Sequence, residues 1–196
     1  MMSEEKTITK VPLWLATAIT VMVALIPAFF FGGYAFTAWL GFVVWAQYFK
    51  TGDGRPGNWK IISPCLLAGS LNGALYIAVS VFLARIFGRA AGEGEIAAYA
   101  GWAVGALVTT PLLICPMQAS GLLMKGSLSY FNGYAMVFAA YFTASYPRVG
   151  PLDHPYWPVL LSLIWVNLMG QYGWLIGYLN IKLTFPRTVM VKKQGN

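Results

Sequence analysis

The fold is decided by the stretch AFTAWLGFVVWAQYFKTGD, residues 35–53. It contains an apolar run of about 16 residues, whereas an upright transmembrane helix needs about 20. A similar stretch, SYFNGYAMVFAAYFTAS, occupies residues 129–145. When the two are aligned on their ends, WAQYF at 45–49 falls on FAAYF at 138–142. Each copy follows a long hydrophobic run and precedes a loop, a proline and another long run. The chain therefore divides into two similar halves.

The composition indicates a membrane protein. The chain is 58% hydrophobic and 10% charged, whereas soluble domains carry about 25% charged residues. Its mean hydropathy is +0.63. We therefore predict an all-α membrane protein in which residues 1–196 form a single membrane domain within the lipid bilayer. The net charge of +7 comes from loops and the C-terminus, as insertion topology requires, and does not indicate a nucleic-acid partner.

Six transmembrane segments are predicted, with short second and fifth segments, at approximately residues 11–31, 34–49, 61–84, 96–124, 129–146 and 159–179. The third is expected to begin at Ser63 and Pro64, and residues 85–95 are expected to form a loop. Pro111 and Pro116 are expected to kink or interrupt the fourth. Three segments per half make the halves enter the membrane from opposite sides, so the pattern predicts a 3+3 inverted repeat.

The basic residues predict the orientation. With six crossings both termini lie on one side, which then holds ten cations: Lys6, Lys10, Lys50, Arg55, Lys60, Lys125, Lys182, Arg187, Lys192 and Lys193. The opposite side holds only Arg85, Arg89 and Arg148. Because cytoplasmic loops are enriched in Lys and Arg, both termini are predicted to be cytoplasmic.

No ionisable residue lies in the middle of a predicted segment, which argues against a pump or a proton-coupled antiporter. Neutral polar residues do lie there, and an amide in hydrocarbon must face another helix or a cavity. The two interpretations are interhelical hydrogen bonding and a path for an uncharged solute. For the path, the candidate residues are Trp45, Gln47, Asn72, Gln118, Asn132, Phe138 and Asn167.

Three pairs of glycines stand at helical spacing, which lets helices approach closely. These predicted packing residues are Gly69, Gly73, Gly101, Gly105, Gly173 and Gly177, and an oligomer interface is one use for them. No pairing of a nucleophile with a base and no phosphate-binding fingerprint is present, so we expect neither an enzyme nor a cofactor. Cys65, Cys115 and the only histidine, His154, do not form a metal-ligand pattern.

Several short motifs carry a family resemblance. AWLGF at 38–42, CPMQA at 115–119, an aromatic-Asn-Gly segment with Tyr141 and Phe142, and a glycine-rich last span resemble the DUF1097 family. The resemblance covers about residues 15–180. It implies a multi-span protein of the bacterial inner membrane and supplies neither an activity nor site residues.

The leading hypothesis from the residues is a passive channel or facilitator for a small neutral or weakly polar solute, expected as a homo-oligomer. A non-transporting membrane subunit or scaffold, packed against a partner protein, is the alternative. A secondary transporter with a binding site at broken helices is a third possibility.

Overall fold

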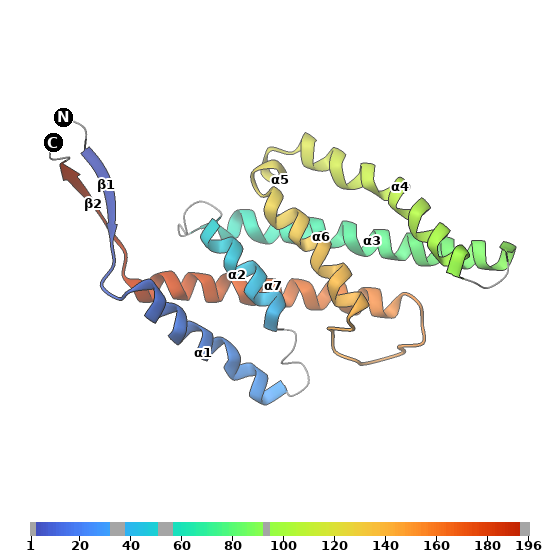
Figure 1. Cartoon of the computed structure of the whole chain (residues 1–196), viewed down its shortest axis with the longest axis horizontal. Coiled ribbons are helices and arrows are strands. Elements are labelled where there is room, and N and C mark those ends of the chain that lie inside the picture. The colour runs from blue at the N-terminus through green and yellow to red at the C-terminus, as the bar shows by residue number, and fades with distance from the viewer. Residues whose placement is uncertain (1–2, 32–37, 51–56, 92–94, 193–196) are drawn as a thin grey trace.

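The computed structural model describes residues 3–31, 38–50, 57–91 and 95–192. The body of the molecule is all-helical, as predicted (Figure 1). Its elements in chain order are β1 (Ser3–Ile8), α1 (Leu13–Phe31), α2 (Ala38–Lys50), α3 (Trp59–Ala91), α4 (Glu95–Ala119), α5 (Gly121–Lys125), α6 (Ser127–Phe142), α7 (Trp157–Thr184) and β2 (Arg187–Lys192).

The two longest helices, α3 and α7, pack against each other at the centre. Ser63 of α3 bonds to Gln171 of α7, and Ser70 of α3 bonds to Asn167. The residue number rises along α3 while it falls along α7, so the two helices are antiparallel. Figure 1 shows them running in opposite directions through the middle of the molecule.

Helix α6 lies along α3 in the parallel direction. A Cβ at Gly69 would meet the backbone of Tyr130, and a Cβ at Gly73 would lie 2.8 Å from the carbonyl oxygen of Tyr134. The residue numbers rise together along α3 and α6, so the two helices run in the same direction. The absence of side chains at these two positions lets the backbones touch, which is the effect expected of a small-xxx-small spacing.

Helix α4 lies along α3 in the antiparallel direction. A Cβ at Gly101 would lie 2.5 Å from the nitrogen of Ala84, and a Cβ at Gly105 would meet Ser80, four residues earlier on α3. Helices α4 and α6 thus both pack on α3, and the second pair of predicted packing glycines also serves a contact within the chain.

Helix α2 lies along α7 in the parallel direction. A Cβ at Gly173 would meet the backbone of Gly41, and a Cβ at Gly177 would lie 2.9 Å from Cβ of Tyr48. Gly173 and Gly177 therefore permit a close approach of α7 and α2, as Gly69 and Gly73 do for α3 and α6.

Helix α1 packs mainly on α7, in the antiparallel direction. The Nδ2 of Asn180 donates to Oγ1 of Thr17 over 3.1 Å, and the hydroxyl of Tyr172 donates to the carbonyl of Ala24 over 2.9 Å. Each central helix thus carries one short parallel helix and one antiparallel helix, and these two come from the other half of the sequence.

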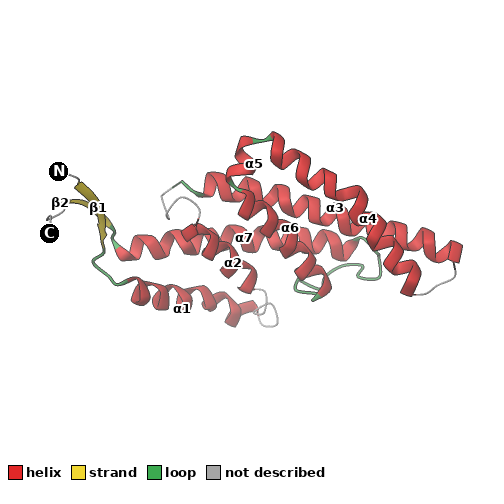
Figure 2. Cartoon of the chain, turned by 45° about the horizontal axis from the view of Figure 1, so that its top comes forward, coloured by secondary structure: helices red, strands yellow, loops and turns green. Residues whose placement is uncertain are grey.

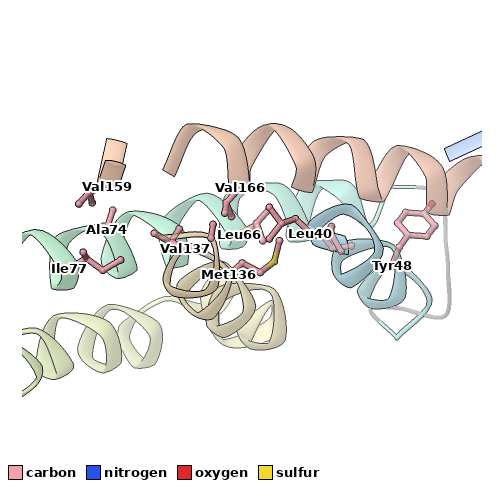
Figure 3. Close-up of a cluster of buried hydrophobic side chains, with 12 residues drawn as sticks. Leu40, Tyr48, Leu66, Ala74, Ile77, Met136, Val137, Val159 and Val166 are labelled. Atoms are coloured by element: carbon pink, nitrogen blue, oxygen red, sulfur yellow. The ribbon is translucent and has the colours of Figure 1, made fainter. Parts of the chain in front are cut away.

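The main core lies where the central pair meets α2 and α6. Leu40, Leu66, Val137 and Val166, one from each of these helices, have no exposed surface, and Figure 3 shows them in a continuous row between the helices. The burial of four apolar side chains of this size contributes about 6–12 kcal/mol of transfer free energy relative to water. In a membrane the same contacts act through packing instead, because lipid is itself apolar.

Three helices of the described chain are long and apolar enough to cross a membrane: Trp59–Gly88 within α3, Tyr99–Ala119 within α4, and Trp157–Thr184. Leu13–Ile26 of α1 is a shorter apolar helix. The predicted segments correspond to α1, α2, α3, α4, α6 and α7, while the number of crossings stays a prediction. Residues 34–37 of the second predicted segment lie outside the described residues.

Two predicted boundaries of the third segment were wrong. The helix begins at Trp59 and not at Ser63, because the carbonyl of Asn58 accepts the first helical hydrogen bonds, from Ile61 and Ile62, each over 2.9 Å. It also continues to Ala91 through part of the predicted loop. Gly88 in this extension weakens a helix by about 1 kcal/mol but does not end it.

The fourth predicted segment, 96–124, is interrupted, but not at a proline. Pro111 and Pro116 both lie inside α4. The break comes at Ser120, which is extended and caps α5 by accepting from the backbone nitrogen of Leu123 over 3.3 Å. Ser is a favoured N-cap because its hydroxyl bonds one of the free amides of the first turn.

The two chain ends pair in an antiparallel ribbon that the sequence did not predict. Ser3 lies opposite Lys192, and Ile8 lies opposite Arg187. The amide of Lys10 also donates to the carbonyl of Thr184 over 3.0 Å, so the ribbon continues onto the end of α7. Figure 2 shows both strands at one end of the molecule, outside the helices. The two termini therefore lie together.

Candidate functional site

The seven predicted path residues do not form one cluster. Gln47 and Trp45 lie on α2, Asn167 lies on the α3–α7 contact, and Asn72 and Phe138 lie where α3 meets α6. Asn132 is half-buried on α6, and Gln118 is exposed on α4. The structure therefore divides these residues into those bonded between helices, those buried without a bond, and those at the surface.

The contact between α3 and α7 carries two polar crossings, which we call the central seam: Ser63 with Gln171, and Ser70 with Asn167. The hydroxyl of Ser63 donates to Oε1 of Gln171 over 2.7 Å. The indole of Trp174 donates to the same oxygen over 2.7 Å. Two donors on one oxygen fix the Gln171 side chain in place.

The second crossing of the central seam leaves one atom without a partner. The Nδ2 of Asn167 donates to Oγ of Ser70 and to the carbonyl of Leu163, each over 2.8 Å. Its Oδ1 is buried and has no hydrogen bond in the described part of the chain. An acceptor thus remains free between the two central helices.

Asn72 joins three helices through one tyrosine. Its Nδ2 donates to the hydroxyl of Tyr130 on α6 over 2.9 Å, and also to the carbonyl of Ala68 over 3.1 Å. The Tyr130 hydroxyl donates in turn to the carbonyl of Leu113 on α4 over 2.9 Å. Because every partner belongs to the protein, this arrangement is interhelical bonding of the kind that holds membrane bundles together.

Phe138 belongs to an aromatic row beside this junction. Its ring lies 4.9 Å from those of Tyr76 and Tyr134, and Tyr76 lies 5.7 Å from Trp102 of α4 in an edge-on contact. Offset and edge-on aromatic pairs are each worth about 0.5–1.5 kcal/mol beyond their buried area. The hydroxyl of Tyr76 also donates to the carbonyl of Trp102 over 3.0 Å, so the row packs α3, α4 and α6 together.

Gln47 differs from the other amides. Its side chain is 3% exposed, and neither the nitrogen nor the oxygen of its amide has a hydrogen-bond partner among the described residues. It follows Val44 by three residues and precedes Tyr48, both of which belong to the main core. A complete amide is therefore buried, and neither of its bonding groups has a partner in the described part of the chain.

Trp45 lies two residues before Gln47 on α2, about 200° around the helix. Its ring is 6% exposed and packs against Ala24 and Ile176, with Phe42 at 5.8 Å between ring centroids. Its indole N–H is buried and has no partner within the described chain. Within one turn of α2, on sides of the helix about 200° apart, lie a donor and an amide that have no partner among the described residues.

Sequence reasoning missed Ser63 and Tyr130, whose hydroxyls complete the central seam and the Asn72 junction. The sequence pattern around a serine or tyrosine in an apolar segment does not indicate which residue it bonds. The partner lies 108 residues away for Ser63 and 58 residues away for Tyr130. In the described part of the chain, no group of three or more His, Cys, Asp and Glu residues could hold a metal ion. His154 is exposed in the loop before α7.

An all-helical body with three helices of this length and hydropathy defines a helical membrane protein. The chain belongs to the family described as protein of unknown function (DUF1097), whose model matches residues 14–184. Neither the curated proteins nor the solved structures contain a match to it.

Proposed function

We propose that the protein is a membrane channel or facilitator for a small neutral or weakly polar solute. The observation that carries this proposal is the buried amide of Gln47, which has no hydrogen-bond partner among the described residues. An amide held in apolar surroundings without a hydrogen bond costs about 1–3 kcal/mol on protein mutational scales. A water or solute molecule that bonds this group offsets that cost.

Two other buried groups have no partner among the described residues; Oδ1 of Asn167 extends the proposed path, while Trp45 stands about 200° around α2 from Gln47. The Trp45 indole lies on α2, and Oδ1 of Asn167 lies in the central seam, which adjoins the core that α2 enters. All three groups are neutral, and the buried polar residues of the described chain include no charged side chain. A path lined in this way favours an uncharged solute, because an ion would lose its hydration without a compensating charge.

The packing supports six segments arranged as an inverted repeat. If α1, α2 and α3 correspond to α4, α6 and α7, then the α1–α7 contact corresponds to α4–α3, and α2–α7 corresponds to α6–α3. Both members of each pair run in the same relative direction. Glycines permit close approach in both short-helix contacts. These are the relations that a two-fold axis between antiparallel α3 and α7 produces.

The distribution of cations supports cytoplasmic termini in a bacterial inner membrane. All five lysines with described side chains are exposed, and they lie near the start of α1 or α3 or at the ends of α2, α5 and α7: Lys10, Lys50, Lys60, Lys125 and Lys182. The ribbon of the two termini lies at the end of the molecule where α1 begins and α7 ends (Figure 1). A concentration of lysine at one end is the positive-inside pattern.

Stopped-flow measurements on proteoliposomes test the proposed function, with water, glycerol, urea, small amides and short-chain acids as solutes. We expect faster passage of at least one solute than in empty vesicles, and Gln47→Leu should lower that rate. Gln118→Leu is the matched control, since it makes the same change at an exposed position of α4. If wild-type protein passes none of the solutes, or both variants behave alike, the proposed path is wrong.

The alternative of a non-transporting subunit is favoured by the bonded state of Asn72 and of the Asn167 nitrogen, which act within the bundle. The same variant separates the two proposals. In a subunit, Gln47→Leu removes an unused amide and should raise stability by about 1–3 kcal/mol without loss of partner binding. In a channel it should lower flux.

A further inference from the structure

One face of the central pair carries none of the described helices. Gly69 and Gly73, which face α6, follow Leu67 and Leu71 by two residues, or about 200° around the helix. On α7, Gly173 and Gly177, which face α2, precede Leu175 and Leu179 by the same interval. The leucines therefore lie opposite α2 and α6.

The leucines on this face form two exposed stripes. On α3 the stripe consists of Leu67, Leu71 and Leu75, and on α7 it consists of Leu160, Ile164, Leu168, Leu175 and Leu179. Their spacings of four and seven residues keep each stripe on one side of its helix. We call the two stripes together the open face.

Each stripe ends in a lysine at the end of the molecule that carries the termini. Lys60 precedes Leu67 by seven residues, and Lys182 follows Leu175 by seven, so each lysine stands two turns, about 10 Å, from a leucine of its own stripe. Both lysines are exposed. No carboxylate is present among the described side chains at this end. Among the described side chains, the charge of the open face at this end is therefore positive.

Aromatic rings connect the two lysines. The Lys60 ammonium lies 6.0 Å from the ring centroid of Trp59, which stacks on Trp174 at 6.0 Å. Tyr178 stands one turn beyond Trp174, and the Lys182 ammonium lies 4.8 Å from its ring centroid. Trp and Tyr favour the level of lipid headgroups, where one side of the ring is apolar and the other is wet.

We propose that the open face is a binding site for an anionic phospholipid. The headgroup phosphate binds at Lys60 and Lys182 over the rings of Trp59 and Trp174, and the acyl chains lie along the two leucine stripes. A leaflet is about 15 Å deep, half of the bilayer core, so the acyl chains reach Leu71 and Leu175 but not the far end of either stripe. This site is independent of any transport.

A second copy of the chain suits this face less well. A dimer that packed two open faces about an axis parallel to the helices would bring Lys60 and Lys182 of both copies to the same end. Four like charges would then be gathered in the contact, and like charges without compensation oppose association. An anionic headgroup neutralises them instead.

Native mass spectrometry of the detergent-purified protein tests the site, with phosphatidylglycerol and phosphatidylcholine of identical acyl chains as probes. A lysine near an anionic lipid contributes about fivefold in affinity. The K60Q/K182Q variant should therefore bind phosphatidylglycerol about 25-fold more weakly, with phosphatidylcholine binding unchanged. K50Q/K125Q removes the same charge from the same end but away from the open face, and should bind like the wild type.

Three results would overturn the proposal. The first is equal loss in both double variants, which would indicate a general effect of charge. The second is retention of phosphatidylglycerol binding by K60Q/K182Q. The third is a dimer of the Leu71→Cys variant that forms disulfide crosslinks through the new cysteine, which would place a second copy on the open face. Preserved helical circular dichroism in each variant shows that the fold is intact.

Discussion

Gly69→Ala should destabilise the protein by about 2 kcal/mol. The new Cβ would overlap the carbonyl oxygen of Tyr130 and lie 2.7 Å from its carbonyl carbon. Both obstacles are backbone atoms, so α3 and α6 must move apart. Overpacking of this kind costs up to about 3 kcal/mol. Alanine offsets about 1 kcal/mol of that cost, because it is a better helix former than glycine.

Gly88→Ala is the matched control on the same helix. Nothing lies within 4 Å of the position that its Cβ would take, so only the helix preference remains and stability should rise by about 1 kcal/mol. For a chain of this size, 1 kcal/mol corresponds to about 2–4 °C in Tm. We therefore expect Gly69→Ala to melt about 4–8 °C below the wild type and Gly88→Ala about 2–4 °C above it.

The assay is thermal unfolding in detergent, followed by circular dichroism at the helical bands. If Gly69→Ala melts at or above the wild-type temperature while Gly88→Ala behaves as expected, the close backbone contact between α3 and α6 does not exist. The parallel pairing of α3 with α6 would then be wrong.

Three further predictions concern contacts and orientation. A double-mutant cycle between Asn72→Leu and Tyr130→Phe should give a coupling of about 0.6 kcal/mol, typical of a hydrogen bond between membrane helices; additive effects in unfolding measurements would contradict the bond. A membrane-permeant maleimide should label the exposed Cys115 before the buried Cys65, and faster labelling of Cys65 by mass spectrometry would show that α5 does not cover it. Reporter domains fused to either terminus should both be active in the cytoplasm, and opposite results for the two fusions would exclude the paired ends.

The helical body could be predicted from the sequence because apolar length and composition are local properties. The short α2 and α6 were visible as aromatic segments between longer ones. Helix ends depend on single backbone bonds, and these were missed: Asn58 starts α3 earlier than expected, and Ser120 ends the run that the prolines were expected to kink or interrupt. The terminal ribbon pairs residues almost the whole chain apart, which no local pattern reveals.

Only the residue types of the candidate site could be predicted from the sequence. Neutral amides at membrane depth are uncommon, so they were identifiable by residue type alone. Their surroundings were not, since α2 and α4 are both largely apolar and offer no polar face by which to orient them. Gln47 and Gln118 are residues of the same type in similarly apolar segments, yet Gln47 is buried and Gln118 is exposed. Only the pairing of helices distinguishes them.

The packing of α1 determines when the molecule can be completed during synthesis. Helix α1 is made first, but its main partner is α7, which is made last. At 5–20 residues per second, the roughly 125 residues between them take about 6–25 s to synthesise. Throughout that interval the first helix lacks its final neighbour. The ribbon of β1 and β2 forms later still, because β2 follows α7 in the sequence.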